Sequence, residues 1–499
     1  MTTDQLSVVI LLGSAIVLVA VVGVRLAARL GVPGLLLYLF LGIALGEDGL
    51  GIVFDDADLA TVLGYVALAI ILAEGGLTTR VTQLRPVAAP ALALASVGMA
   101  VSIGVVATVL HVGLGTDWRT ALLLGTVLAP TDAAAVFSVL RSSRVAPRLR
   151  VLLEAEAGFN DAPAVVLVAV LSSTAFGDAS PWLIPVVVLI ELVAGAVIGL
   201  AVGYVARVLL PRLALPASGL YPIATLAFIA TAYGLASFLH TSGFMAVYVA
   251  SVLIAASPIP HRRSVIGFVE GLAWTAQIGL FIMLGLLSDP SRLTDAVGIA
   301  VVTCLALVFL ARPLSVVVSL VPFRLPPRWR LYLSWAGLRG AVPIVFASIP
   351  LGENVPDSAV IFDATLLVVV VLTLVQTPTL PWFARRIGVE ESTPVGELEV
   401  DSAPLDGMRA GLLGLDVPAG SNLVGTYVRE LGLPDGAVVS LVVRDGAGMV
   451  PDLQTRLRAG DRLLVVATDD VRSAAERRLR AVSRRGRLAA WLGDSGDPD

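Results

Sequence analysis

Long apolar runs separated by short polar loops fill residues 1–389. Most of these runs are about 17–25 residues long, the length that a helix needs to cross a bilayer. Thirteen spans are predicted: 6–24, 32–47, 58–78, 86–110, 118–140, 151–175, 182–206, 220–239, 242–257, 265–287, 296–321, 331–350 and 359–384. The first run has Asp4 before it instead of a basic flank, so it is expected to remain as a span and not to be a signal peptide.

The distribution of arginine between the loops agrees with this count. Loops after odd-numbered spans hold nearly all Arg residues of the region, whereas the other loops hold only Arg119 and Arg292 beside several acids. Because arginine near the membrane favours the cytoplasmic side, we expect the amino terminus outside and the carboxyl-terminal segment in the cytoplasm of a cell-membrane protein.

Composition excludes most other classes of protein. The 499 residues are 57% hydrophobic and only 14% charged, where soluble chains carry about one-quarter charged residues. A nucleic-acid-binding module, a disordered chain and a disulfide scaffold are excluded, and Cys304 is the only cysteine. Every basic residue is Arg, and the three histidines (His111, His240 and His261) are scattered, so no enzyme and no resident cofactor are expected.

Charged residues inside predicted spans are functional candidates, because each costs about 2.5–3.5 kcal/mol at the bilayer centre. They are Glu74, Asp132, Glu154, Glu156, Asp161, Glu191, Glu270, Arg312 and Arg339. Glu154 is equally well explained as an interfacial residue. Glu191, Glu270 and Arg312 are given no role, although Glu270 and Arg312 could pair.

Asp132 lies in the middle of the fifth span, directly after Pro130 and Thr131. Proline removes a backbone donor, so a locally unwound helix with free carbonyls beside a carboxylate is predicted. The alternative is a plain proline kink. In the sixth span, Glu156 precedes Asn160 and Asp161 by about one helical turn, and these oxygens suit a small cation or a proton.

A second interrupted span is the twelfth, where Gly337, Gly340 and Pro343 surround Arg339. A buried Arg needs a carboxylate, and Glu156 is the predicted partner; an interfacial turn is the alternative reading for Arg339. The fifth and twelfth spans run in opposite directions, so they predict an inverted repeat with an ion site where the two breaks meet. This is the layout of a secondary transporter with alternating access.

The Thr131-Asp132 pair, the Glu156…Asn160-Asp161 cluster and the Gly337–Gly340 stretch resemble the cation:proton antiporter-1 family, across about 1–388. The resemblance implies a polytopic all-α membrane protein with thirteen helices, inverted repeats, two crossed unwound helices, a six-helix core and a dimer domain. The Asn-Asp pair implies electroneutral exchange of K+ or Na+ for H+.

The resemblance also implies roles for individual residues. Asp161 alternately holds the cation and the proton, Asp132 and the Thr131 backbone assist coordination, and Asn160 fixes the geometry. Glu74 matches an acid near the site, and Glu156 with Arg339 forms a supporting ion pair. Some family members have a coordinating Ser where this chain has Ala157.

After residue 390 the share of charged residues rises, because residues 391–499 hold 30 of the 72 charged residues. We expect a linker at 389–403, a small cytoplasmic α+β domain at 404–470 and an Arg-rich tail at 471–499. Strand-like runs at 438–443 and 461–466, a hairpin turn at Asp445-Gly446 and a helix over 421–431 are predicted.

The segment 404–470 resembles an RCK C-terminal (TrkA-C) domain, and it lacks a GxGxxG dinucleotide fingerprint. Antiporters with this module resemble the potassium/proton branch, which favours K+. The domain is expected to bind a regulatory nucleotide such as a cyclic dinucleotide, or to act only in dimerisation. The Arg-rich stretch 472–487 could lie on anionic lipid or form a solvated helix.

Three functions compete at this point. Electroneutral K+(Na+)/H+ exchange by a homodimer is favoured. A ligand-gated cation channel is the alternative, although no TVGYG-like filter is present. A membrane receptor derived from a transport core ranks last.

Overall fold

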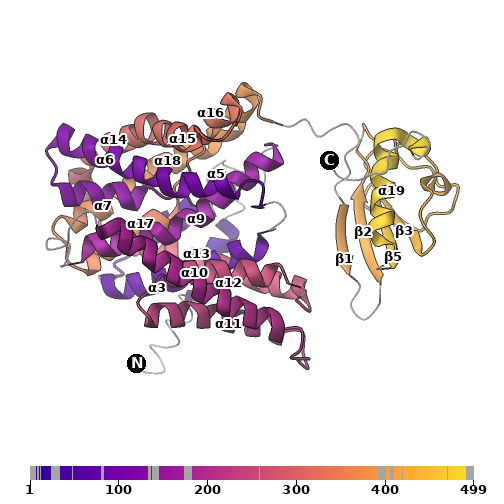
Figure 1. The fold of residues 1–499 in the computed structure, drawn as a ribbon, viewed down its shortest axis with the longest axis horizontal. Coiled ribbons are helices and arrows are strands. Elements are labelled where there is room, and N and C mark those ends of the chain that lie inside the picture. The colour runs from indigo at the N-terminus through magenta and orange to yellow at the C-terminus, as the bar shows by residue number, and fades with distance from the viewer. Residues whose placement is uncertain are drawn as a thin grey trace. The chain divides into compact units, whose positions relative to one another are not determined.

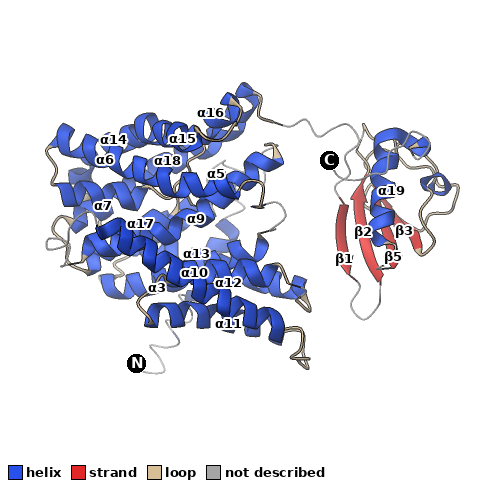
Figure 2. Cartoon of the chain, viewed as in Figure 1, coloured by secondary structure: helices blue, strands red, loops and turns tan. Residues whose placement is uncertain are grey.

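The structure is a computed structural model of the chain, and it describes residues 7, 11, 13–23, 34–47, 49–54, 56–79, 84–132, 136, 145–173, 183–257, 259–390, 400–404, 410–418, 420–468 and 470–489. The chain divides into two compact units, Met1–Glu390 and Glu391–Asp499 (Figure 1). Among its described residues, the regular structure of the first unit is helical, with one isolated bridge between Val145 and Glu390, and the second unit contains a β-sheet (Figure 2).

Apolar helices build the first unit. They are a stretch at 13–23, α2 (Gly34–Leu45), α3 (Ala57–Thr78), α5 (Ala88–Ala93), η1 (Leu94–Gly98), α6 (Met99–Leu114), α7 (Trp118–Leu128), α9 (Pro147–Ser172), α10 (Leu183–Leu209), α11 (Leu220–Phe238), α12 (Gly243–Ala255), α13 (Arg262–Leu287), α14 (Leu293–Ala306), η3 (Leu307–Ala311), α15 (Arg312–Leu320), α16 (Pro327–Trp335), α17 (Ala341–Gly352) and α18 (Ser358–Ile387).

Within the described residues, eight helices are long and apolar enough to cross a membrane, and five shorter apolar helices accompany them. Each of the thirteen predicted spans overlaps one of these helices. The polytopic helical fold is therefore confirmed, whereas the number of crossings stays a prediction.

The helices of this unit form two bundles. In the first, which we call the scaffold bundle, α2, α3 and α10–α13 contact one another. In the second, the core bundle, α5–α7, α9 and α14–α18 do so. The two bundles meet along a seam where α3, α10, α12 and α13 contact α9 and α17 (Figure 1). The α9 helix is buried along most of its length, so it lies at the centre of the unit.

Small residues hold the scaffold bundle together. Gly195, Gly199 and Gly203 stand one helical turn apart on α10 and face the backbone of α12. A Cβ at Gly199 would lie 2.5 Å from the Ala246 carbonyl oxygen, and one at Gly203 would lie 3.0 Å from Cα of Ala250. Close backbone approach of this kind is how helices associate inside a membrane, where lipid tails are as apolar as leucine.

Two helices of the core bundle are interrupted. The α7 helix ends at Leu128 before the irregular segment 129–132, and α16 ends at Trp335 before the irregular segment 336–340. Pro130 and the two glycines, Gly337 and Gly340, account for the breaks. Residues 133–135 and 137–140 of the predicted fifth span lie outside the described residues.

The second unit contains a five-stranded sheet in the order β1-β2-β5-β3-β4, and all four pairs of neighbouring strands are antiparallel. Its strands are β1 (Val400–Pro404), β2 (Ala410–Asp416), β3 (Ala437–Arg444), β4 (Ala447–Met449) and β5 (Arg462–Thr468). Both predicted strand runs are confirmed as β3 and β5. The Asp445-Gly446 turn is also confirmed, since both residues have positive φ angles, 52° and 81°.

Two expectations for this unit are wrong. Residues 421–431 form turns and the short 3-10 helix η4 (Val428–Leu431), because Gly425 adopts a left-handed φ of 89° that ends any regular helix. The Arg-rich segment begins with α19 (Arg472–Arg485), whose Ala475, Leu479 and Val482 are buried in the same core as the sheet. The predicted domain boundary at 470 is therefore too early.

Candidate functional site

The two interrupted helices cross, and each break supplies a charged group to the other. The Asp132 amide donates to the carbonyl of Leu338 (3.0 Å), and the Asp132 Oδ2 accepts from the Ala341 amide (2.8 Å), which begins α17. Arg339 Nη1 donates to the carbonyl of Ala129 (2.8 Å), which follows the end of α7. A carboxylate thus meets a helix amino terminus and a guanidinium meets a helix carboxyl terminus, which are the favourable signs for each helix dipole.

Gly340 must be a glycine for this crossing to close. A Cβ at this position would overlap the carboxylate of Asp132. The predicted pair of crossed, unwound helices is confirmed by these contacts.

Asp161, Asn160 and Thr131 lie beside the crossing, on α9 and on the first break. Asn160 Nδ2 donates to Thr131 Oγ1 (2.9 Å), so the amide group is fixed in orientation. All three side chains are buried. Within the described residues, Asn160 Oδ1 and Asp161 Oδ1 have no hydrogen-bond partner. Two buried oxygens are therefore left to bind something else.

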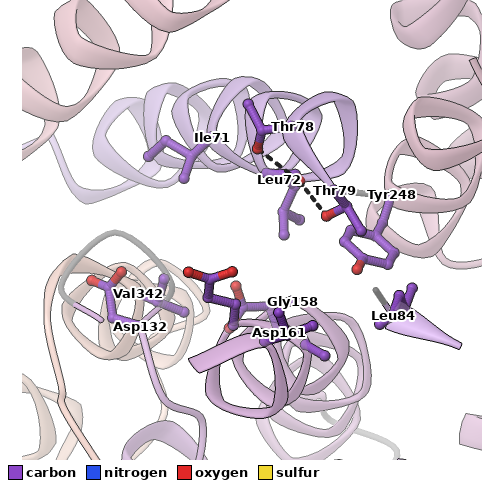
Figure 3. Close-up of a pocket in the computed structure, with 14 residues that line it drawn as sticks. Ile71, Leu72, Thr78, Thr79, Leu84, Asp132, Gly158, Asp161, Tyr248 and Val342 are labelled. Carbon is purple, nitrogen blue, oxygen red and sulfur yellow. Dashed lines mark hydrogen bonds between the residues drawn. The ribbon is translucent and has the colours of Figure 1, made fainter. Parts of the chain in front are cut away.

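A cavity of about 80 Å³ opens beside Asp161. Asp132 and Asp161 of the core bundle both line it. Figure 3 shows their carboxyl groups pointing toward α3, which belongs to the scaffold bundle. From the scaffold bundle, Thr78 and Thr79 at the end of α3 and Tyr248 of α12 complete the wall. The cavity lies in the seam between the bundles and has room for a small cation and a few waters.

The predicted partner of Glu156 is wrong. Its carboxylate accepts from Arg312, with Nη2 to Oε2 at 2.9 Å and a second, shorter contact between Nη1 and Oε1. Arg312 Nε also donates to the carbonyl of Leu333 (3.1 Å), and both charged side chains are buried. Arg312 directly follows the π-helical turn η3, and π turns often mark functional positions.

Arg339 is instead bound to the crossing itself, through Ala129, and it too is buried. The choice between Arg312 and Arg339 depends on how three helices converge in space, which spacing along the chain does not encode. The suggested pairing of Arg312 with Glu270 stays a prediction, since the hydrogen bonds of Arg312 among the described residues go to Glu156 and Leu333.

Glu74 lies near the Asp161 cavity but does not line it. It lies on α3 between Leu72 and Gly75, which both line the cavity. Its carbonyl oxygen accepts from Thr78 Oγ1 (2.9 Å). Its role at the site stays a prediction.

Glu154 lines the mouth of the cavity and pairs with Arg150, at 2.8 Å between Nε and Oε1. Tyr248 and the Thr78-Thr79 pair were not predicted, since hydroxyl-bearing residues at span ends carry no distinctive pattern. Asp363 was also missed. It is a buried carboxylate on α18, and its position inside the predicted span 359–384 was a sufficient signal.

Known proteins identify this arrangement. The profile of the family described as "Sodium/hydrogen exchanger, transmembrane" matches residues 16–386, and that of the "TrkA-C domain" matches residues 412–480. The chain belongs to the transmembrane sodium/hydrogen exchanger family.

Relatives of this family cover nearly the whole chain. A K(+)/H(+) antiporter NhaP of Alkalimonas amylolytica is 32% identical over 93% of this chain and 82% of its own length. A K(+)/H(+) antiporter NhaP2 of Shewanella sp. strain MR-4 is 34% identical over 94% and 83%. The solved sodium proton antiporter MjNhaP1 of Methanocaldococcus jannaschii superposes with a TM-score of 0.68 at 21% identity, covering 78% of this chain and 100% of that one.

The chain is therefore a multi-pass membrane antiporter of cations and protons, and not an enzyme. The channel and receptor hypotheses find no support among these relatives.

Proposed function

We propose that this protein exchanges K+ for H+ across the cell membrane, with Na+ as a weaker substrate, and that Asp161 holds the two ions in turn. The observation that carries the proposal is the pairing of Asp132 and Asp161 in one buried cavity, where Asp161 Oδ1 has no partner among the described residues. A carboxylate in such a place needs a compensating positive charge, and either a proton or a metal cation supplies it.

Coupling between cation and proton transport follows because Asp161 can hold only one of the two ions at a time. Asp132 already accepts from the Ala341 amide and is committed to the helix crossing, so Asp161 is the group that is free to exchange. A proton on Asp161 removes the charge that attracts the cation, and a bound cation displaces the proton. With Asn160 beside it instead of a second carboxylate, one cation is exchanged for one proton, and the cycle is electroneutral.

The seam between the two bundles supports alternating access. The ion-binding residues belong to the core bundle, and the opposite wall of the cavity belongs to α3 and α12 of the scaffold bundle. Movement of one bundle along the other would carry Asp161 from one membrane face to the other. Neutralising the buried charge lowers the cost of that movement.

The preference for K+ rests on two arguments. The relatives at 32–34% identity are named K(+)/H(+) antiporters. The site also has one side-chain oxygen fewer than in family members with a coordinating serine, because Ala157 offers none. A site with few hard ligands favours the cation that loses its hydration water more easily, which is K+.

Proton flux in proteoliposomes tests the proposal. Addition of K+ to vesicles loaded at acid pH should move protons out, and clamping the membrane potential at zero should leave the rate unchanged. Proton movement that requires a membrane potential would contradict electroneutral exchange, and K+ flux without proton flux would contradict antiport. Repeating the assay with Na+ ranks the two cations.

The carboxyl-terminal unit is proposed to regulate this exchange from the cytoplasm by binding a nucleotide, for which cyclic dinucleotides are the first probes. Its match to the TrkA-C domain supports this. Full-length protein should change its K+/H+ rate when cyclic di-AMP or cyclic di-GMP is added, and a chain ending at residue 390 should not. Chemical cross-linking in vesicles tests the predicted homodimer, and protease access to the tail tests its predicted side.

A further inference from the structure

A second polar pocket lies at the other end of the seam from the Asp161 cavity. It has a volume of about 520 Å³ and is lined by Phe54 before α3, by Leu351 and Asn354 at the end of α17, and by the connection between α13 and α14. The Asp161 cavity is instead lined by Thr78 at the end of α3 and Val342 at the start of α17. Since the 22 residues of α3 span about 33 Å, the two hollows lie at opposite faces of the membrane unit.

Beside this far pocket stands the buried carboxylate of Asp363, in the second turn of α18. The residue is 3% exposed, and its Oδ1 has no hydrogen-bond partner among the described residues. Its Oδ2 is 3.9 Å from Nε of Arg292, too far for a hydrogen bond. The transport cavity is at the opposite end of the unit, so the mechanism above makes no use of this charge.

Arg292 lines the far pocket and lies between two carboxylates. Its Nε is 3.1 Å from Asp289 Oδ2 and 3.9 Å from Asp363 Oδ2. The hydroxyl and amide of Ser291 donate to Asp289 and hold its pKa below the usual value, so Asp289 stays charged and competes for Arg292. Both Asp289 and Arg292 belong to the connection from α13 of the scaffold bundle to α14 of the core bundle.

Arg292 is the N-cap residue of α14, in the same bundle as Asp363, whereas Asp289 follows the end of α13 in the other bundle. Movement of one bundle along the other would therefore change how Arg292 is shared between Asp289 and Asp363. An Arg292 side chain that turned fully to Asp289 would leave Asp363, directly behind the pocket wall, with no fixed counter-charge. A buried carboxylate in that position attracts a small cation or a proton.

We propose that the far pocket is the second mouth of the transport path in its closed state, and that Asp363 is a binding site for the transported monovalent cation there, with Arg292 as the counter-charge that the cation replaces. The proposal rests on the antiport function and adds a site to it. It assigns the first contact at the far face to Asp363, before the ion reaches Asp161.

Half-saturating K+ concentrations, measured separately at the two faces of oriented vesicles, test the site. The Asp363→Asn variant should raise this concentration about tenfold at the far face, the loss expected for about 1.4 kcal/mol of charge attraction, and should leave the near face unchanged. Asp363→Glu should restore most of the affinity. Asp295→Asn is the matched control, because this exposed acid lies at the same end on α14 but does not line the pocket.

The outcomes separate this site from the antiport function itself. Equal changes at both faces, or no change at the far face, would overturn the Asp363 proposal while antiport stands. Loss of antiport in the unmodified protein would instead overturn the proposed function.

A labelling experiment keeps the proposal testable if Asp363→Asn fails to fold. Cys304 is the only cysteine, so a Cys304→Ser, Ser288→Cys chain carries one thiol, at a buried position of the far pocket. Adding Arg292→Gln should speed its reaction with a membrane-impermeant maleimide several-fold, and Arg292→Lys should have a smaller effect. An unchanged rate in Arg292→Gln would overturn the assignment of Arg292 as the counter-charge of the closed mouth.

Discussion

Helix α9 presents two buried carboxylates to opposite surroundings. Glu156 and Asp161 are five residues apart, which turns them by about 140° around the helix axis. Glu156 faces into the core bundle and is bound by both terminal nitrogens of Arg312. Asp161 faces the seam, lines a cavity and keeps one oxygen without a hydrogen bond among the described residues.

The difference shows how one helix can hold both a structural charge and an exchangeable one. A carboxylate paired with a buried guanidinium is neutralised permanently, because neither partner can leave. A carboxylate without such a partner is neutralised only by something that arrives and departs. Within the part of the chain that the structure describes, Asp161 is thus distinguished from Glu156 by the lack of a neighbouring guanidinium group.

Removing the exchangeable charge should have the largest effect. Asp161→Asn should reduce K+/H+ exchange to the background of empty vesicles, a loss of at least about 100-fold, because the amide can neither release a proton nor neutralise a cation. Proton-flux measurement in proteoliposomes checks this. Thermal unfolding should change little, since Asp161 makes few fixed contacts; a variant that retained half of the activity would refute its assigned role.

Removing one half of the permanent pair should damage the fold instead. Arg312→Met leaves the Glu156 charge buried and alone, and should cost about 3–5 kcal/mol of unfolding free energy. The double variant with Glu156→Gln should recover most of this loss, because no uncompensated charge remains. Melting temperatures in detergent for the two single variants and the double variant measure the coupling.

The same comparison explains which part of the site could be read from the sequence. Asp132, Asn160 and Asp161 were identified because Pro130 and the repeated polar positions are local features of two spans. The sequence predicts Arg339 as the partner of Glu156, whereas the structure has Arg312 there, since both arginines lie in spans and only the convergence of several helices in space decides between them. The helical fold was predicted from run length alone, whereas the cavity wall formed by Tyr248 depends on α12 meeting α9 across the seam.

Sliding along the seam should be sensitive to a single methyl group. A Cβ at Gly158 would lie 3.0 Å from Cε2 and 3.2 Å from the hydroxyl oxygen of Tyr248, which comes from the other bundle. Gly158→Ala should therefore slow K+/H+ exchange about three- to tenfold, an overpacking cost near 1 kcal/mol. Initial rates at saturating K+ measure this.

Gly75 provides the matched control for that variant. It lines the same cavity, but a Cβ there would have no atom within 4 Å. Gly75→Ala should leave the rate within about twofold of the unmodified protein, which is the range expected when no atom must move. Equal slowing by both alanines would mean that backbone flexibility, and not contact with Tyr248, limits the rate.

A further prediction, confined to stability, concerns the ion pair of the second unit. Asp461 is buried and accepts from Arg444 Nε and Nη2, both at 2.8 Å, and from the Arg458 amide. The Arg444 side chain, and after it the Arg458 amide, lower the pKa of Asp461. The stability that results should be fully present above about pH 5 and be lost as the pH falls below about 4, through the folded-state pKa.

Hydrogen exchange of β3 and β5 in the full-length protein measures this loss. Arg444→Gln should reduce protection at pH 7 by about 2 kcal/mol and remove most of the change between pH 5 and pH 3. Asp416→Asn is the control, because the Asp416–Arg462 contact of 3.7 Å is exposed and should contribute less than about 0.5 kcal/mol. If Arg444→Gln retained the full acid sensitivity, Asp461 would not be its source.

The glycines of α10 have a consequence for the speed of the protein. At Gly195, Gly199 and Gly203 the backbone of α10 packs directly against the backbone of α12. This contact contains few side chains that could change rotamer to let the two helices move apart. The seam to the core bundle is different, since rings and hydroxyl groups face each other there. We therefore expect α10 and α12 to move together as one rigid body. Motion should be concentrated at the seam to the core bundle, and the side-chain contacts there should limit the turnover rate.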